Sequence, residues 1–95
     1  MKFLEKYEFS KEDIADFLNN SPKKLIDTIK ENKKLVGQNI AYLKDLGITN
    51  YQQIFLSYYD VFLMDHSNFV DIFSKYDPED LIEKLKKNIK IIEYL

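Results

Sequence analysis

The residues that most often carry out catalysis or bind metals are few in this sequence. The 95-residue chain has one histidine, His66, and no cysteine, which excludes thiolate metal sites, cysteine nucleophiles and disulfide bonds. Asp65 flanks His66, and Asp60 and Asp71 lie nearby in sequence, but their spacing matches no metal-binding or acid–base motif. We therefore expect His66 to be a turn residue that caps or hydrates a helix end.

Acyl-transfer and nucleotide chemistry also lack their usual motifs. Ser57 and Ser67 have no second histidine, no oxyanion loop and no nucleophile elbow around them. The chain has two glycines, so no glycine-rich phosphate loop is present. The sequence predicts a protein that is not an enzyme and has no cofactor, metal or small-molecule substrate.

Lysine is the most prominent charged residue. All 14 basic residues are lysine, and the net charge is −2. Residues 17–44 hold six lysines and two acids, a net charge of +4, whereas residues 45–80 carry −6. On one continuous helix, five lysines fall within about 100° of one another: Lys23, Lys30, Lys33, Lys34 and Lys44. This Lys-rich face of residues 23–44 is a candidate contact for phosphate or for an acidic partner surface, and the alternative is an ordinary solvated helix face.

Aromatic residues are unusually dense, with seven phenylalanines and seven tyrosines. We expect four phenylalanines in the core: Phe55, Phe62, Phe69 and Phe73. A tyrosine combines a large apolar area with a polar end and is enriched at interfaces. Tyr58 or Tyr59 is therefore a candidate for a partner-binding or self-association surface.

Start and stop signals divide the chain into helices. Ser10 is placed to cap the first helix, and Ser21-Pro22 and Asp77-Pro78 to start two others. Thr49 and Gln52 have the order of a capping box, and Gly47 suits the left-handed position that ends a helix. With the apolar spacing, these signals predict helices over about 11–20, 22–46, 50–64, 67–76 and 78–94.

Two of these helices have alternatives. The helix over 22–46 is either continuous or bent or broken near 32–37, where Gly37 is a poor helix former. Residues 54–64 are rich in aromatic and β-branched side chains, which would also suit a strand. The fold we predict is a single all-α domain over residues 1–95. It is either a compact five-helix bundle or a short right-handed stack of helical repeat units.

An internal repeat supports the stacked alternative. Residues 14–32 align without gaps on residues 70–88, and Phe17, Pro22 and Asn32 match Phe73, Pro78 and Asn88. Two units that obey the same packing rules could also look alike without forming a repeat architecture. If they do form one, each unit needs a neighbour to bury its apolar face.

The pattern Ser-Lys-Glu-Asp-Ile-x7-Pro over residues 10–22, with the helix end Tyr-Leu-Lys-Asp-Leu-Gly-Ile-Thr-Asn over 42–50, resembles the mitochondrial transcription termination factor repeat. The resemblance covers about residues 9–63. It implies a curved stack of short helices that binds nucleic acid along a basic concave face. This chain differs in having Asp60 near the second unit's proline position and no arginine, and we transfer no binding residue.

Together, these features predict a helical module that binds another macromolecule. The first hypothesis is a protein-interaction domain whose partner is another protein or a second copy. The alternative is a nucleic-acid-binding helical repeat that uses the lysines of residues 23–44. A phosphate binder should lose affinity steeply as salt rises, whereas a tyrosine-rich protein interface should not. The charged N-terminus resembles no secretory signal, and the apolar stretch 54–64 contains Ser57 and Asp60, so we expect a cytoplasmic protein with no membrane contact.

Overall fold

All the regular secondary structure of the chain is helical. The computed structural model describes residues 1–95 and contains no β-strand, which confirms the all-α prediction and rules out the strand over 54–64. Seven α-helices and two 3₁₀ helices follow one another: α1 (Lys2–Glu5), α2 (Lys11–Asn20), α3 (Lys23–Glu31), α4 (Lys33–Leu46), α5 (Tyr51–Ser57), η1 (Tyr59–Leu63), α6 (His66–Ser74), α7 (Pro78–Lys87) and η2 (Ile89–Tyr94). None of them is both long enough and apolar enough to cross a membrane.

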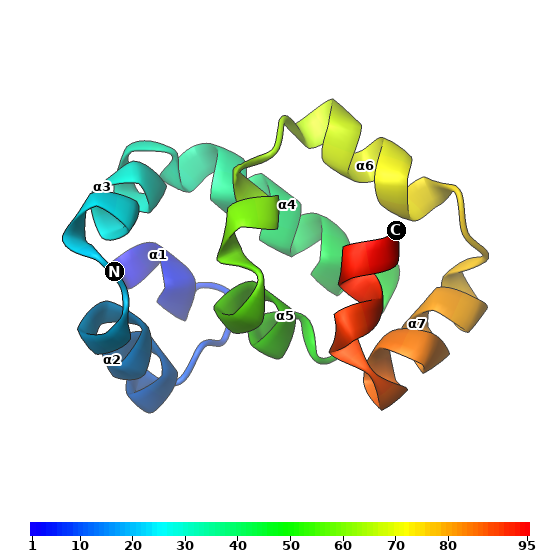
Figure 1. Ribbon diagram of the computed structural model, residues 1–95, viewed down its shortest axis with the longest axis horizontal. Coiled ribbons are helices and arrows are strands. Elements are labelled where there is room, and N and C mark those ends of the chain that lie inside the picture. Colours follow the sequence, from blue (N-terminus) through cyan, green and yellow to red (C-terminus); the bar gives the residue numbers. More distant parts are fainter.

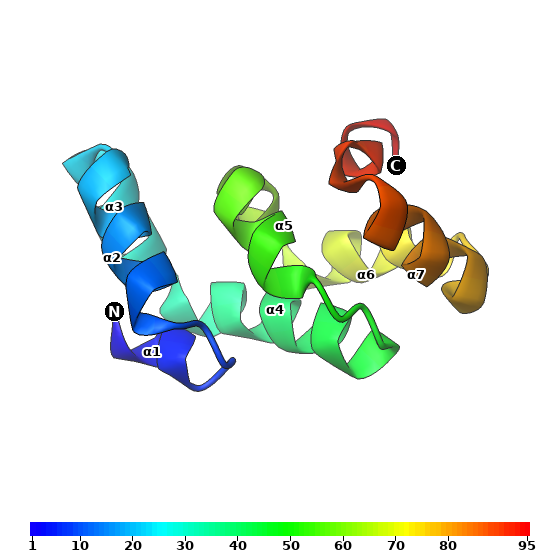
Figure 2. The same ribbon diagram turned by 90° about the horizontal axis from the view of Figure 1, so that it is seen from below.

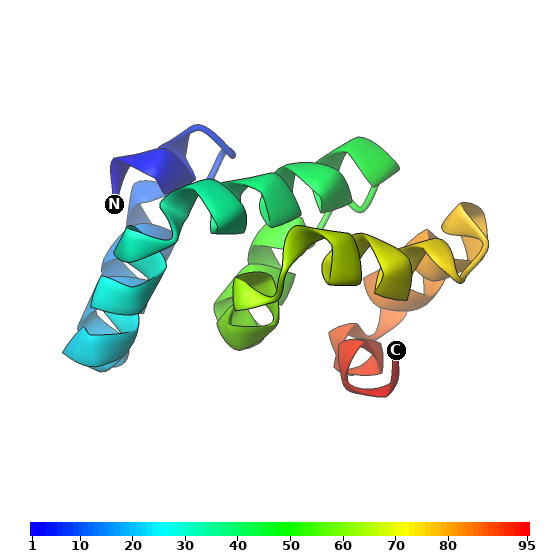
Figure 3. The same cartoon turned by 90° about the horizontal axis from the view of Figure 1, so that it is seen from above.

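The longest helix, α4, crosses the middle of the view in Figure 1 and runs along one side of the molecule in Figures 2 and 3. The α2–α3 pair and α5 stand off from it in succession, and α7 with η2 occupies the far end (Figures 2 and 3). The short α1 packs beside α4. The molecule measures 36 × 25 × 23 Å. Because α4 contacts α1, α3, α5, η1 and α6, it is the element on which the rest of the fold is assembled.

For the predicted helix over 22–46 the broken alternative is correct, because the segment forms two helices that meet at Asn32. Asn32 has φ −111° and ψ 25°, and its side-chain amide donates to the Thr28 carbonyl at 2.8 Å. An asparagine that satisfies a carbonyl of the last turn competes with helix continuation, which explains the break. Gly37, the residue that suggested a break, instead lies inside α4.

The predicted helices over 50–64 and 78–94 also divide. Tyr58 (φ −134°, ψ 45°) separates α5 from η1, and Asn88 (φ −157°, ψ 106°) separates α7 from η2. Tyr58 is followed by a run of aromatic and β-branched residues, which are weak helix formers. Asn88 accepts a hydrogen bond from the Lys90 amide, and this local bond replaces the helical one. The helix predicted over 67–76 is α6, which spans His66–Ser74, and α1 was not predicted.

The predicted helix caps have mixed outcomes. The Ser10 hydroxyl accepts from the Asp13 amide at 3.0 Å, and Asp77 accepts from the Asp80 amide at 3.2 Å, as predicted. Gly47 has φ 100° and ends α4 in the left-handed conformation, also as predicted. The capping box at Thr49 is wrong. Asn50 is the N-cap of α5, and its side chain makes no capping bond to the helix. The side-chain amide of Asn50 donates instead to the Leu85 carbonyl at 3.0 Å.

Pro22 also differs from its predicted role at the first helical position. It is the N-cap of α3, which has no side-chain capping bond, so Ser21 does not cap that helix. In contrast, Pro78 occupies the predicted position in the first turn of α7. The two proline-containing turns therefore start their helices in different ways.

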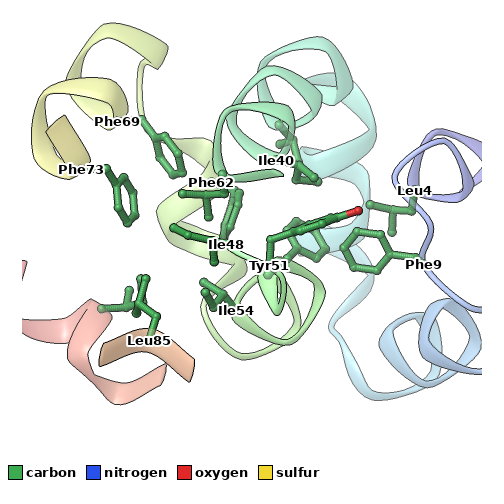
Figure 4. Close-up of a cluster of buried hydrophobic side chains, with 14 of the residues drawn as sticks. Leu4, Phe9, Ile40, Ile48, Tyr51, Ile54, Phe62, Phe69, Phe73 and Leu85 are labelled. Atoms are coloured by element: carbon green, nitrogen blue, oxygen red, sulfur yellow. The ribbon is translucent and has the colours of Figure 1, made fainter. Parts of the chain in front are cut away.

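Phenylalanine rings form the centre of the core (Figure 4). Phe9 and Phe55 lie 5.5 Å apart between ring centroids, Phe55 and Phe62 5.3 Å, Phe62 and Phe69 5.3 Å, and Phe69 and Phe73 4.7 Å. The four predicted core phenylalanines are thus buried, and with Phe9 they join the start of α2 to α6 through α5 and η1. Tilted and edge-on ring pairs of this kind are favourable beyond the area they bury.

One polar side chain, Asn39 of α4, is completely buried. Its amide nitrogen donates to the carbonyl oxygens of Phe62 at 2.9 Å and Met64 at 3.0 Å, and its Oδ1 lies 2.8 Å from Nδ1 of His66. Because the amide nitrogen is used by the two carbonyls, Oδ1 accepts a hydrogen bond from the imidazole. Asn39 therefore holds the chain where η1 passes into α6.

The two segments that match in sequence have the same order of secondary structure. Residues 14–32 form α2 and α3, residues 70–88 form α6 and α7, and each pair has a proline at its turn and an asparagine at its end. Phe17 and Phe73, which occupy matching positions, are both buried. The order of two α-helices and a 3₁₀ helix also occurs twice, in α4–α5–η1 and in α6–α7–η2.

Candidate anion-binding pocket

Lysines from two helices surround the largest pocket of the molecule. The pocket measures about 570 Å³ and lies between α1 and the N-terminal half of α4. Four of its lining residues are lysines, two are aromatic, and none is acidic. The lining comprises Lys2, Phe3, Lys6, Tyr7, Lys33, Lys34, Gln38 and Ala41. We call this the four-lysine pocket.

The spacing of residues along each helix brings these side chains to one side. Lys2 and Lys6 are four residues apart, as are Phe3 and Tyr7, so each pair projects from the same side of the α1 turn. On α4, residues 34, 38 and 41 recur at helical spacing along one stripe. Helix α1 continues into a tight turn in which the amides of residues 7 and 9 both bond to the Leu4 carbonyl. That turn carries Tyr7 back towards α4.

Four contacts fix α1 against the rest of the fold. Leu4 is fully buried in the core. The Tyr51 hydroxyl donates to the Tyr7 carbonyl at 2.6 Å, and Gln52 donates to the same oxygen at 3.5 Å. Beyond the turn, Glu8 forms an ion pair with Lys44 at 3.4 Å. One wall of the pocket is therefore held by α4 and α5 and does not depend on the short α1 helix alone.

Gly37 is the point of closest approach between α1 and α4. A Cβ atom at this position would lie 2.8 Å from the Tyr7 hydroxyl oxygen and 3.4 Å from Cζ. The absence of a side chain therefore lets the Tyr7 ring pack directly on α4. This close approach is the physical reason for a glycine inside a helix, where it costs about 1 kcal/mol relative to alanine.

The four lysines give the pocket a local positive charge on a chain whose net charge is −2. All four lysines are exposed to solvent. Lys33 and Lys34 lie in the first turn of α4, where the helix dipole adds partial positive charge. An ammonium group binds phosphate or carboxylate as a compact charge with three donors. The pocket is therefore suited to an anion that also has an apolar or planar part to contact the two rings.

The five lysines proposed from the sequence lie on two helices and not on one continuous helix. Lys33 and Lys34 line the pocket, whereas Lys44 lies farther along α4 in its ion pair with Glu8. Lys23 and Lys30 belong to α3, which the break at Asn32 separates from α4, and they do not line the pocket. The Lys-rich face of residues 23–44 is therefore divided between two helices. The sequence interpretation also missed Lys2 and Lys6, although their spacing of four was a usable signal.

Tyr58 and Tyr59 are each only half-exposed. The Tyr58 hydroxyl donates to a Glu93 carboxylate oxygen at 2.8 Å, and this bond raises the pKa of the phenol because the bond requires its proton. The Tyr59 ring packs edge-on against Phe17, with centroids 5.9 Å apart. The exposed large apolar side chains lie elsewhere and are Tyr76, 37% exposed, and Tyr94, 84% exposed.

Tyr59 also lines a smaller groove between α2 and α5. This groove of about 250 Å³ has two carboxylates at its side and an apolar floor. Its lining comprises Asp13, Asp16, Phe17, Asn20, Ser21, Leu56 and Tyr59. We call it the α2–α5 groove. Its charge is opposite to that of the four-lysine pocket.

His66 differs from the solvated turn residue that the sequence suggested. It is the first residue of α6, is half-buried and bonds to Asn39, with the Tyr42 ring edge-on at 6.3 Å. No group of three histidine or acidic side chains lies close enough together to hold a metal ion. Asp65 instead accepts a hydrogen bond from the Ser67 hydroxyl, which lowers the pKa of its carboxyl group.

Comparison of the chain with protein-family models, with curated protein sequences and with solved structures gave no match. The functional interpretation therefore depends on the geometry of the pocket and the groove.

Proposed function

We propose that this protein is a non-enzymatic helical module that binds the phosphate backbone of a nucleic acid in the four-lysine pocket. The observation that carries the proposal is the convergence of Lys2 and Lys6 from α1 with Lys33 and Lys34 from α4 around a pocket with no lining carboxylate. The backbone of a nucleic acid carries one negatively charged phosphate per nucleotide at regular spacing. Four ammonium groups in one place therefore supply both attraction and hydrogen-bond donors.

The negative net charge of the chain does not oppose this proposal. At physiological salt, charges farther away than about 8 Å are largely screened. None of the acidic residues of 45–80 lines the pocket, whereas all four lysines do. Lysine is also an effective phosphate ligand, although it lacks the paired geometry of arginine.

The architecture that fits this function is a short right-handed stack of helical units. Its support is the sequence match of 14–32 with 70–88, the shared structure of α2–α3 and α6–α7, and the repeated order of two α-helices and a 3₁₀ helix. The resemblance to the transcription termination factor repeat points to the same class of partner. The four-lysine pocket, however, uses α1, which lies outside the residues that carry that resemblance.

The test is the salt dependence of binding to a fluorescent oligonucleotide. If all four lysines contact phosphate, the plot of log affinity against log salt should have a slope between about −2.8 and −3.6. Reversing two charges with Lys33→Glu and Lys34→Glu should make the slope shallower by about 2 and weaken binding at low salt.

Two matched variants complete the design. Lys84→Glu with Lys86→Glu makes the same change in net charge on α7, away from the pocket, and should leave the slope unchanged. Lys23→Glu with Lys30→Glu tests the α3 lysines in the same way. If all three double variants weaken binding equally, the effect is one of net charge, and the pocket is not the binding site.

A second candidate function is protein binding or self-association through the α2–α5 groove. The observation that favours it is the apolar floor of the groove, where Leu56 and Tyr59 are half-exposed beside Asp13 and Asp16. Such a groove suits a partner with an apolar side chain flanked by lysine or arginine. Sedimentation over a wide concentration range tests the self-association form. A single monomer boundary at every concentration would contradict it, whereas a dimer that Leu56→Glu dissociates would support it.

A further inference from the structure

We infer that the four-lysine pocket takes an unpaired, single-stranded segment, with a base stacked on the Phe3 ring while the lysines hold the flanking phosphates. This inference rests on the proposed function and specifies the form of nucleic acid. The observation behind it is that Phe3 and Tyr7 line the same pocket as the four lysines. Bases in a duplex are stacked on one another, so a protein ring can stack only on a base that is not paired.

Phe3 is the one phenylalanine that is not buried. Every phenylalanine from Phe9 onwards is buried, whereas Phe3 packs against the edge of the core and is half-exposed at the pocket. Its neighbour on α1, Leu4, supplies the fully buried anchor of the helix. The exposed part of the Phe3 ring is therefore the apolar surface that a planar ligand in the pocket can contact.

The second ring is fixed in place. The Tyr7 ring packs on Gly37, and its backbone carbonyl accepts the hydrogen bond from Tyr51. Both rings line the pocket, and the position of the Tyr7 ring depends on its contact with Gly37. Because any side chain at residue 37 would displace the Tyr7 ring, Gly37 is a positioning residue for the pocket.

The size of the pocket also favours a single strand. A volume of about 570 Å³ is that of a small-molecule site and would enclose a nucleotide or two. A duplex would contact the outer rim of the pocket with its phosphates and leave the rings unused. A single strand uses both the charge and the aromatic surface, and stacking adds to its affinity.

The experiment compares four fluorescent probes by anisotropy at low salt. They are an oligothymidylate of about ten nucleotides, a blunt duplex of the same length, an abasic strand with the same phosphates, and a polyglutamate peptide. We expect the single strand to bind at least about 10-fold more tightly than the abasic strand, because stacking on an aromatic side chain is typically worth 5- to 150-fold. The duplex and the abasic strand should bind with similar, weaker affinity.

Phe3→Ala should lower the affinity for the single strand by about 5-fold or more, leave the affinity for the abasic strand unchanged, and leave the salt slope unchanged. Phe3→Trp should restore binding. Tyr94→Ala, which removes the most exposed tyrosine at the other end of the chain, is the matched control and should have no effect. Thermal melting of each variant establishes that it is folded. Should Phe3→Ala fail to fold, Phe3→Leu keeps the apolar volume and should show the same loss of single-strand affinity.

Gly37→Ala tests the positioning of Tyr7. The variant should bind the single strand more weakly by a few-fold while its melting temperature is unchanged or higher, because alanine is the better helix former. A purely structural role for Gly37 would lower the melting temperature and leave the affinity of the folded protein unchanged.

The outcomes separate the two proposals. Equal affinity for the single strand, the duplex and the abasic strand, with a steep salt slope, would overturn single-strand selection and leave phosphate binding intact. An undiminished affinity in Phe3→Ala would also overturn it. Binding of polyglutamate more tightly than any oligonucleotide, or no salt-dependent binding at all, would overturn the proposed function together with this inference.

Discussion

The buried amide of Asn39 provides the sharpest test of how the fold is held together. Replacing it with alanine removes the donor for two backbone carbonyls, those of Phe62 and Met64, and the acceptor for His66. The bond to Phe62 is fully buried, whereas the other two are partly buried. In the variant, water can therefore bond in part to the Met64 carbonyl and to His66, but it cannot reach the Phe62 carbonyl.

The cost follows from these three bonds. An unsatisfied buried carbonyl costs about 1–3 kcal/mol, and each of the two partly buried bonds is worth about 0.5–1 kcal/mol. Asn39→Ala should therefore lower the free energy of unfolding by about 3 kcal/mol, a large share of the 5–15 kcal/mol typical of a domain. For a chain of this length the melting temperature should fall by roughly 12–24 °C.

Urea unfolding followed by far-ultraviolet circular dichroism gives the free energies. Gln38→Ala, at the adjacent exposed position, is the control and should change stability by less than about 0.5 kcal/mol. Asn39→Asp keeps the shape of the side chain but replaces the donor with a carboxylate oxygen, so it should cost at least as much as alanine. His66→Ala removes the third bond and the edge-on contact with Tyr42 but leaves both carbonyl bonds in place, so it should cost less than Asn39→Ala, about 1–2 kcal/mol. If Asn39→Ala is as stable as Gln38→Ala, the amide does not hold the η1–α6 connection and our account of it is wrong.

Three further predictions concern local features. Gly47→Ala should destabilise the protein by about 1–2 kcal/mol in chemical denaturation, because residue 47 has φ 100° and an added Cβ would lie 3.2 Å from Cδ1 of Ile82; wild-type stability would contradict the strain. Burial, aided by the nearby Glu8 carboxylate, raises the pKa of the Tyr51 phenol above its ordinary value. The unfolded phenol therefore ionises first, so the free energy of unfolding should fall as pH rises above about 10, and Tyr51→Phe should make that fall shallower in denaturant titrations at a series of pH values. Asp77→Ala should remove the cap of α7 and lower the free energy of unfolding by about 1 kcal/mol in the same assay. Asp77→Asn keeps a capping oxygen, so an equal loss in that variant would show that capping is not the cause.

The predictions of helix ends that succeeded from sequence depend on local interactions. A serine or aspartate before a helix bonds to an amide three residues on, and a glycine adopts a left-handed conformation at a helix end, whatever the rest of the fold does. The caps at Ser10 and Asp77 and the end of α4 at Gly47 were therefore predictable. The four core phenylalanines were predictable too, because only burial accommodates so many large rings.

Of the helix breaks at Asn32, Tyr58 and Asn88, only the first was predicted, as one of two alternatives for residues 22–46. The apolar spacing of about 3.6 residues continues across each of them, so periodicity gives no sign of an interruption. What ends each helix is a competing local bond or a run of weak helix formers. Gly37 was expected to favour a break, but it lies inside α4, where the lack of a side chain allows the packing contact with Tyr7.

The sequence by itself determined that this chain is helical and where several of its helices begin and end, because those properties follow from bonds and spacings within a few residues. It also indicated which rings are buried, because of their size and apolar character. Only the tertiary structure decided which lysines lie together. Lys2 and Lys6 lie about thirty residues from Lys33 and Lys34, and they meet because Leu4 is buried, Tyr7 packs on Gly37 and Tyr51 bonds to the Tyr7 carbonyl. No pattern confined to one helix contains that information, since each of these contacts joins residues from different helices.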